Sequence, residues 1–255
     1  MRNNHPLSPV ADRIANASRG GAHLIVVAPP KSASTFFSNV LAECLGLKRE
    51  VYWDKLSGPN DISIARAIEL SDADYLIHCH SSASRKMLSL LSAIGARPVV
   101  LHRPIADSIV SMNEHRIRRG RALMDQALQG LELNDQLRLT AANWIDWYIQ
   151  YEISWRSMQN RSILDLEFAE ITQSPASAVL KALRFWNLHP NAAGINETIE
   201  NHLKDTSRSN IIIGKIGRGA GLPDDVQHTL RLSEEAFRKY FAAQNISMRM
   251  DGIFF

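Results

Sequence analysis

The sequence predicts an α/β fold: a single domain whose mostly parallel central sheet is flanked by helices. An unbroken apolar run at 24–28 and mainly apolar runs at 75–79 and 98–102 are typical of strands buried on both faces. Each run is followed by a segment of helical character, and such βαβ alternation produces parallel sheets covered by helices. With 255 residues, of which 45% are hydrophobic and 22% charged, the chain can bury the core of one such domain.

The elements are predicted in a simple order. Residues 1–22 are polar and are expected to form an N-terminal arm, and residues 23–255 are expected to form the domain. The first strand and helix cover about 23–46, where Gly46 suits a helix end. Further strands are expected at 75–79, 98–102 and 162–166, and helices at 60–70, 82–94, 105–118, 134–158, 175–187 and 222–243.

The segment after the first strand predicts an anion-binding loop. It reads Pro-Lys-Ser-Ala-Ser-Thr-Phe-Phe over 30–37 and leads directly into a helix. Backbone N–H groups and the dipole of a helix N-terminus attract anions, Lys31 adds a full charge, and the hydroxyls add donors. A Walker A loop needs a glycine immediately before the lysine, where this chain has Pro30, and another earlier in the loop. Because both glycines are missing, an ordinary ATP or GTP loop is disfavoured.

Two more strand ends carry candidate functional side chains. Arg103 stands at the tip of the strand 98–102, and Ser111 lies two turns into the next helix, so both can face one end of the sheet. A guanidinium offers planar recognition of a phosphate. His80 ends the strand 75–79, where a histidine can act as a general base or serve only as a structural or solvated side chain.

These three segments, in this order, resemble motifs of the PAPS-dependent sulfotransferases. Residues 30–37 are similar to the 5′-phosphosulfate loop Pro-Lys-Ser-Gly-Ser/Thr-Thr-Trp, with Ala33 in place of the glycine and Phe36 in place of the tryptophan. Residues 103–111 resemble the 3′-phosphate motif Arg-x-Pro-x-Asp-x-x-x-Ser, with Arg103 and Ser111 on its two key positions, but the proline of this chain, Pro104, stands one position earlier than in the motif. His80 matches the histidine of a Lys-Thr-His-Leu segment, in which His78 replaces the lysine.

The resemblance implies a P-loop-like fold and a nucleotide-binding transferase. Such an enzyme moves a sulfuryl group from PAPS (3′-phosphoadenosine 5′-phosphosulfate) to a hydroxyl or amine of a small-molecule, carbohydrate or lipid acceptor. The product is PAP (adenosine 3′,5′-bisphosphate). Lys31 and His80 are the catalytic residues that the resemblance implies. The cofactor-binding residues that it implies are Lys31, Ser32, Ala33, Ser34, Thr35, Phe36, Arg103, Ser111, Gly214 and Lys215.

A glycine-rich segment late in the chain, 211–219, is less specific. Gly214 and Gly217 match the glycines of the family's Arg-Lys-Gly-x-x-Gly loop, which closes over the 3′-phosphate, but isoleucines occupy 212–213. The segment can equally be an ordinary glycine loop before the last helix. If it closes over a phosphate, its charge has to come from Arg208, Lys215 or Arg218.

Charge and composition set further expectations. A basic cluster follows the second motif and is either a solvated helix end or a surface that attracts an anionic acceptor or the cofactor. Its members are Arg116, Arg118, Arg119 and Arg121. A net charge of +3 fits an anionic small ligand without requiring nucleic acid. The sequence offers no His/Cys/Asp cluster at metal-ligand spacing, so no metal is expected.

The sequence also bears on the cellular compartment, and it leaves alternatives open for the function. Cys44 and Cys79 lie far apart, the first residues lack a signal-peptide pattern, and no apolar run reaches the length of a membrane span. Golgi sulfotransferases normally begin with a membrane anchor. Because no such apolar segment is seen in this sequence, a cytoplasmic and bacterial enzyme is expected. One alternative function is an ATP-dependent small-molecule or nucleotide kinase. Another is a catalytically inactive homologue that binds PAPS or PAP. The departures from the family's motifs at Ala33, Phe36 and 212–213 keep it open, as does Phe168, which replaces a tyrosine of the family.

Overall fold

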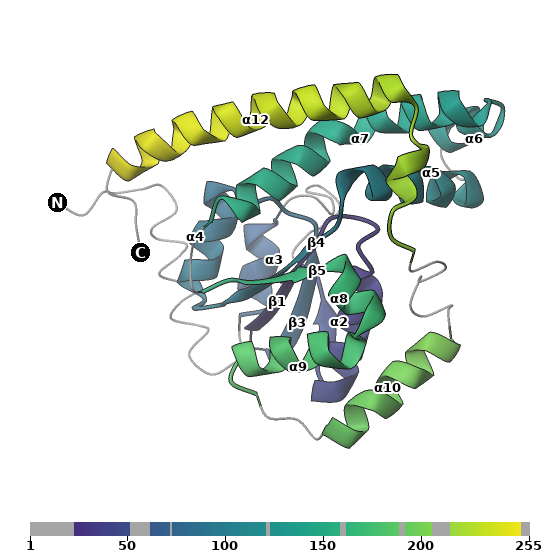
Figure 1. Ribbon diagram of the computed structural model, residues 1–255. Helices are drawn as coiled ribbons and strands as arrows, with labels where there is room; N and C mark the ends of the chain where they lie inside the picture. The colour runs from purple at the N-terminus through teal and green to yellow at the C-terminus, as the bar shows by residue number, and fades with distance from the viewer. Residues whose placement is uncertain are drawn as a thin grey trace. The chain divides into compact units, whose positions relative to one another are not determined.

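The computed structural model of the chain (Figure 1) describes residues 23–51, 62–71, 73–120, 123–158, 162–188, 192–205 and 215–250. The predicted N-terminal arm and Gly214 lie outside these ranges, so the boundaries 1–22 and 23–255 stay a prediction. Contacts divide the chain into two compact units. The first unit comprises Met1–Pro29, Ala33–His102 and Asn160–Gly214, and the second comprises Pro30–Ser32, Arg103–Gln159 and Lys215–Phe255.

The first unit contains a five-stranded sheet in which every pairing is parallel, in the order β2-β3-β1-β4-β5. The predicted α/β class with a parallel sheet is therefore confirmed. The three apolar runs form the centre of the sheet, as burial on both faces requires. The strands are β1 (His23–Val27), β2 (Lys48–Glu50), β3 (Tyr75–Cys79), β4 (Pro98–His102) and β5 (Leu164–Glu167).

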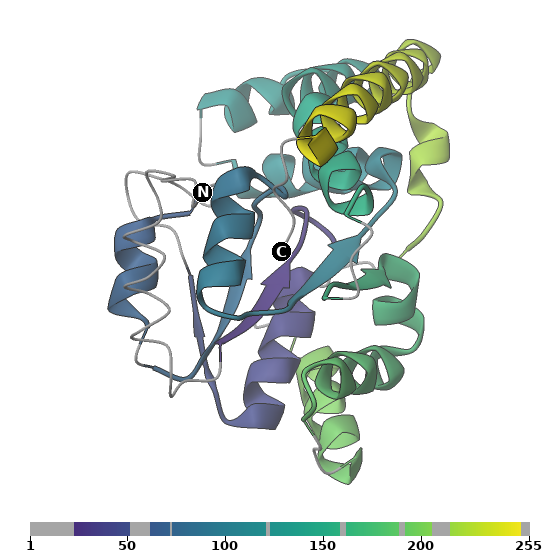
Figure 2. The same ribbon diagram turned by 90° about the vertical axis from the view of Figure 1, so that its left-hand side faces the viewer.

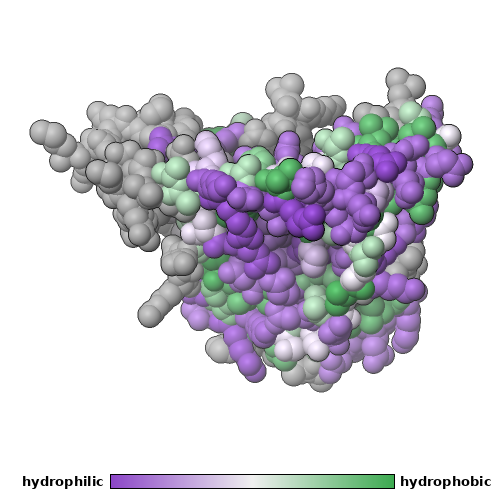
Figure 3. Space-filling view, turned by 45° about the horizontal axis from the view of Figure 1, so that its top comes forward, coloured by the Kyte–Doolittle hydropathy of each residue, from purple (hydrophilic) through white to green (hydrophobic). Residues whose placement is uncertain are grey.

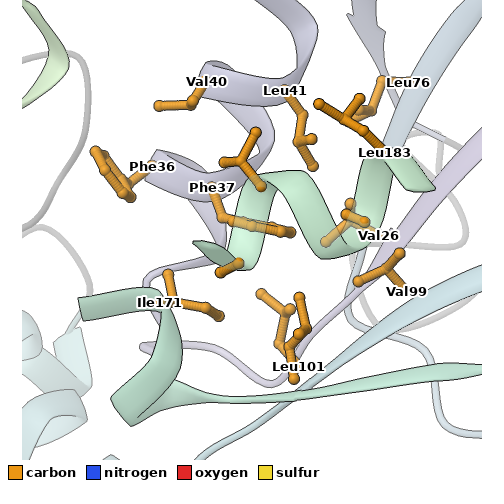
Figure 4. Close-up of a cluster of buried hydrophobic side chains, with 14 of the residues drawn as sticks. Val26, Phe36, Phe37, Val40, Leu41, Leu76, Val99, Leu101, Ile171 and Leu183 are labelled. Atoms are coloured by element: carbon orange, nitrogen blue, oxygen red, sulfur yellow. The ribbon is translucent and has the colours of Figure 1, made fainter. Parts of the chain in front are cut away.

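Helices cover both faces of this sheet. The first group packs against one face: α2 (Ser34–Leu45), α8 (Phe168–Gln173), α9 (Pro175–Phe185) and α10 (Ala192–Lys204). Figure 4 shows Phe37 of α2 and Ile171 of α8 among the strand residues Val26 and Leu101, all of them fully buried. On the opposite side of the sheet, Figure 2 shows α3 (Ile64–Glu69) and α4 (Arg85–Ala93).

The second unit is helical. Its elements are α5 (Ile105–Arg119), α6 (Leu123–Gln129), α7 (Leu133–Arg156), the 3₁₀ helix η1 (Arg218–Gly221) and α12 (Asp224–Met250). A cluster that includes Ile109, Tyr148 and Leu222 forms its core. Aromatic side chains of α7 belong to this packing, and Trp147 stacks on Tyr151 with ring centroids 5.7 Å apart.

Hydrophilic side chains dominate the face shown in Figure 3, and hydrophobic ones are scattered among them. Two large hydrophobic side chains on α12, Leu232 and Tyr240, are more than half exposed, at 54% and 58%. Among the helices that the structure describes, none is long and apolar enough to cross a membrane.

Candidate active site

The chain passes from β1 to α2 through backbone suited to an anion. Lys31 has φ 72° and Ala33 has φ 62°, whereas Ser32 between them does not have a positive φ. Alternation of this kind turns successive N–H groups toward one concave side and forms an anion-binding nest. Ala33 is the N-cap residue of α2 and makes no side-chain capping hydrogen bond. The first N–H groups of α2 therefore lack the acceptor that a capping side chain supplies.

The predicted hydroxyls and aromatic ring of this loop differ in burial. Ser32 and Ser34 are buried, and Thr35 is half-buried. Phe36 is 1% exposed, belongs to the hydrophobic core and meets His202 edge to face. Its ring serves packing, so a contribution of Phe36 to ligand binding has to come from the backbone.

In the second unit, Arg103 links the loop that contains Lys31 to the late glycine segment that contains Lys215. Its side chain is buried, at 3% exposure. Nη1 donates to the carbonyl of Lys31, and Nη2 donates to the carbonyl of Lys215 over 3.4 Å. The Arg103 backbone N–H donates to Oε1 of Glu152 over 3.3 Å. The structure thus brings together Lys31, Arg103 and Lys215, which the sequence assigned to a single cofactor.

Tyr148 supports the same loop from α7. Its hydroxyl donates to the carbonyl of Pro30 over 3.1 Å, and burial raises the pKa of the phenol, which keeps the proton on this donor. The sequence analysis did not single out Tyr148 as a site residue. The residues lie 118 positions apart, and no local pattern indicates such a contact.

The late glycine segment is fixed to the start of α5. The carboxylate of Asp107 accepts the backbone N–H of Gly217 over 2.9 Å and that of Gly219 over 2.7 Å. A Cβ added at Gly219 would lie 2.3 Å from the Cβ of Ala106, so only glycine fits this approach. Arg218 forms a salt bridge with Glu114 of the same helix. Asp107 belongs to the predicted 3′-phosphate motif, but its link to Gly219 was not predicted.

Positive charge surrounds the Lys31 ammonium. Its pKa is lowered to about 8 by burial and by the charges of Arg118, Arg103 and Arg119, against the opposing influence of Glu114. The pKa of His115 is lowered to about 4, by burial and then by Lys31, Arg119 and Arg118. Such mutual repulsion in the free protein favours a bound anion.

Ser111 shares a face of α5 with these groups. It lies four residues after Asp107 and four before His115, and residues at this spacing stack on one side of a helix. Ser111 is half-buried, as expected for a hydroxyl beside a surface site.

In the first unit, the hydrogen bond that His80 makes suits a general base. Its Nδ1 lies 2.7 Å from the carbonyl oxygen of Ala28, just beyond β1. Because a carbonyl only accepts, Nδ1 carries the proton and Nε2 keeps its lone pair. Burial lowers the pKa of His80 below its usual value, although the Ala28 bond opposes the shift. The imidazole is therefore neutral at pH 7 and able to take a proton at Nε2.

Two neighbouring histidines differ from His80. His78 packs edge to face on His80, with ring centroids 4.9 Å apart, and burial holds its pKa well below the usual range. Its Nε2 is buried and has no hydrogen-bond partner in the part of the chain that the structure describes. The ring of His102 is fully buried and its Nε2 lies 2.8 Å from Asp165, which joins β4 to β5.

No group of metal-binding side chains is found within the described ranges, and the expectation of a metal-free enzyme stays a prediction. Comparison with known protein families and with curated proteins finds no match for the sequence.

Solved structures do match the fold. A mouse sulfotransferase in complex with PAP superposes with a TM-score of 0.61 over 87% of each chain, at 11% identity. Retinol dehydratase in complex with androsterone and PAP has a TM-score of 0.55 at 13% identity, over 91% of this chain and 84% of its own. Its complex with retinol and PAP has the same TM-score and identity, over 90% and 85%. The five-stranded parallel sheet and its helices therefore form the fold of the PAPS-dependent sulfotransferases.

Proposed function

We propose that the protein is a PAPS-dependent sulfotransferase that transfers a sulfuryl group to a hydroxyl or amine of a small-molecule, carbohydrate or lipid acceptor. One observation carries this proposal: the guanidinium of Arg103, from the 3′-phosphate motif, donates to the backbone of Lys31, from the 5′-phosphosulfate motif. The contact supports a ligand that presents two anionic groups to these segments, as PAP and PAPS do. The PAP complexes of the matching folds support the same ligand.

Binding of the donor follows from the groups that hold charge. The N–H groups of Ala33, Ser34, Thr35 and Phe36 and the ammonium of Lys31 hold the 5′-phosphate, with the hydroxyls of the loop as further donors. Arg103 and Ser111 hold the 3′-phosphate. Arg103 has five N–H donors, so it can bind a phosphate while it keeps a bond to the loop carbonyls.

Transfer then needs little covalent chemistry from the protein. His80 takes the proton of the acceptor hydroxyl at Nε2 as the hydroxyl oxygen forms a bond to sulfur. The bond from sulfur to the bridging oxygen breaks, and its electron pair leaves with PAP. Lys31 stabilises the charge that develops on this leaving oxygen. Positioning and electrostatic stabilisation supply most of the rate, as they do in phosphoryl transfer.

The first test concerns the donor. Arg103→Ala should weaken PAP by roughly 10- to 100-fold more than it weakens adenosine 5′-monophosphate, because one charge-assisted pair to a phosphate contributes about 1.5–3 kcal/mol. Arg103→Lys, which keeps a charge, should retain part of the difference. Calorimetric titration of both nucleotides measures it. Equal losses for the two nucleotides would show that Arg103 serves the fold alone.

The second test concerns the chemistry. His80→Ala should lower turnover of PAPS by roughly 10²- to 10⁴-fold, the usual loss for a positioned general base, and leave PAP affinity nearly unchanged. Release of PAP during transfer to a screened acceptor gives the rate. Near wild-type turnover would exclude His80 as the base and direct attention to the other histidines near the strand ends, His78 and His102. PAP binding without transfer to any acceptor would favour the inactive homologue, and preference for ATP would favour the kinase.

A further inference from the structure

The basic cluster predicted after the second motif separates into residues with different roles. Arg116 is bound to Asp125 in a salt bridge of 2.9 Å in which both side chains are only 13% exposed, so it holds α5 to α6. Arg118 and Arg119 remain on the exposed end of α5, and the side chain of Arg118 is 45% exposed. Arg121 lies outside the described residues.

The described acids near this end of α5 only partly balance its charge. Arg118 binds Glu114 over 3.3 Å, but the same carboxylate also binds Arg218. One carboxylate thus faces two guanidinium groups, and Arg119 and Lys31 add further positive charge. Burial is the main reason that the pKa values of Lys31 and His115 are lowered, and repulsion from the neighbouring positive charges lowers them further.

The positions of Arg118 and Arg119 along α5 argue against the 3′-phosphate as the anion that these two side chains bind. They follow Ser111 by seven and eight residues, which places them about 10–12 Å further along the helix axis. They nevertheless act on Lys31, the residue assigned to the oxygen from which the sulfuryl group departs. An anion near them is therefore on the sulfuryl side of the donor, where an acceptor must approach.

We propose that the acceptor is itself anionic, and that Arg118 and Arg119 bind its carboxylate or phosphate while its hydroxyl receives the sulfuryl group. This inference rests on the proposed function and names the substrate class. His115, half-buried and neutral, stands between Ser111 and the two arginines on the same helix and adds a polar contact without a competing charge.

Two matched pairs of probes test the proposal in the PAP complex of the full chain. One pair is 4-hydroxyphenylacetate and 4-hydroxyphenylacetamide, and the other is glucose 6-phosphate and glucose. Each pair differs only in the anionic group, and the two pairs distinguish a carboxylate on an aromatic acceptor from a phosphate on a sugar. The charged member of at least one pair should bind more tightly, as measured by calorimetry or ligand-observed NMR.

The double variant Arg118→Gln, Arg119→Gln should reduce that preference by about 3- to 30-fold, the range expected for two exposed charge pairs. The double lysine variant should restore most of it, since charge is kept. The matched control is Arg138→Gln, which removes an exposed arginine of the same unit that pairs with Asp135 and Asp225, and it should leave the preference unchanged.

Three outcomes overturn the proposal: no preference for a charged probe, an unchanged preference in the double glutamine variant, or a parallel loss of PAP affinity, which would assign both arginines to the cofactor. Failure of the proposed function has a different signature. In that case PAP itself does not bind, and the same probe pairs, titrated into the free protein, still decide whether Arg118 and Arg119 recognise an anion.

Discussion

Lys31 is the residue whose protonation should affect ligand binding most directly. In the free protein its pKa is lowered to about 8, because burial and the charges of Arg118, Arg103 and Arg119 disfavour the ammonium. A phosphate bound at Lys31 favours the ammonium, so binding raises this pKa. Above pH 8, binding therefore takes up a proton, and affinity falls as the pH rises.

The expected result is a PAP affinity that is nearly constant below about pH 7.5 and falls by up to tenfold per pH unit above pH 8. The phosphates of PAP have completed their ionisation by then, since their second pKa is about 6. Calorimetry in buffers of different ionisation enthalpy measures both affinity and proton uptake. In Lys31→Arg the guanidinium stays charged, so a similar pH dependence in that variant would contradict the assignment.

At this scale, the sequence predicts residues whose chemistry is carried by their own side chain. Lys31, Arg103 and His80 could be named as candidates because a charged or titratable residue follows an apolar strand. The contacts of Tyr148 with Pro30 and of Asp107 with Gly219 could not be found, since they join residues 118 and 112 positions apart and depend on packing.

Among the elements, α2 begins with backbone strain. Ala33 has φ 62° and ψ 16°, a left-handed conformation that costs a residue with a Cβ about 1–2 kcal/mol. Ala33→Gly should therefore raise the free energy of unfolding by about 0.5–1 kcal/mol after the entropy of glycine is subtracted. Urea denaturation measures the change. Ala142→Gly, at an exposed position inside α7, is the control and should lower the free energy of unfolding by about 1 kcal/mol. Equal effects of the two variants would refute strain at Ala33.

The 3₁₀ helix η1 offers a second matched pair. Gly219→Ala should destabilise the protein by about 1–3 kcal/mol and weaken PAP, because the new Cβ meets Ala106 at 2.3 Å while the Gly219 N–H is bound to Asp107. Gly221→Ala has no atom within 4 Å of the new Cβ and should be nearly neutral. Denaturation and PAP titration compare them. A neutral Gly219→Ala would mean that the segment is not held against α5.

Element prediction succeeded where periodicity is strong. The strands at 75–79 and 98–102 have the predicted bounds, and the helix predicted at 175–187 runs over Pro175–Phe185. β2 was missed because Lys48–Glu50 is a short, polar edge strand without an alternating pattern. α6 was missed as well, and α12 extends to Met250 rather than ending at about 243.

For the whole molecule, the division into two units was not predicted. Each unit gathers three separate chain segments, and a unit boundary falls between Ser32 and Ala33 and another between His102 and Arg103. Sequence patterns report neighbours along the chain, so they locate the motifs that contain these junctions but not the grouping of distant segments around them.

Ligand binding to the native state alone should raise the melting temperature of the whole chain. PAP at a hundredfold excess over its Kd adds about 2.7 kcal/mol, which for a chain of this size corresponds to roughly 5–10 °C. Adenosine 2′,5′-bisphosphate carries the same charge with one phosphate moved, so at equal concentration it should shift the melting temperature less than PAP. ATP and adenosine 5′-monophosphate, which lack the 3′-phosphate, should also shift it less.

A thermal-shift series with these four nucleotides, repeated at low and high salt, separates general attraction from a built site. Screening weakens the exposed charges around Lys31, whereas it has less effect on contacts with the buried guanidinium of Arg103. The advantage of PAP over its 2′,5′ isomer should therefore persist at high salt. If the two isomers give equal shifts at both salt concentrations, the cationic groups recognise charge alone and Arg103 and Ser111 do not form a site for the 3′-phosphate.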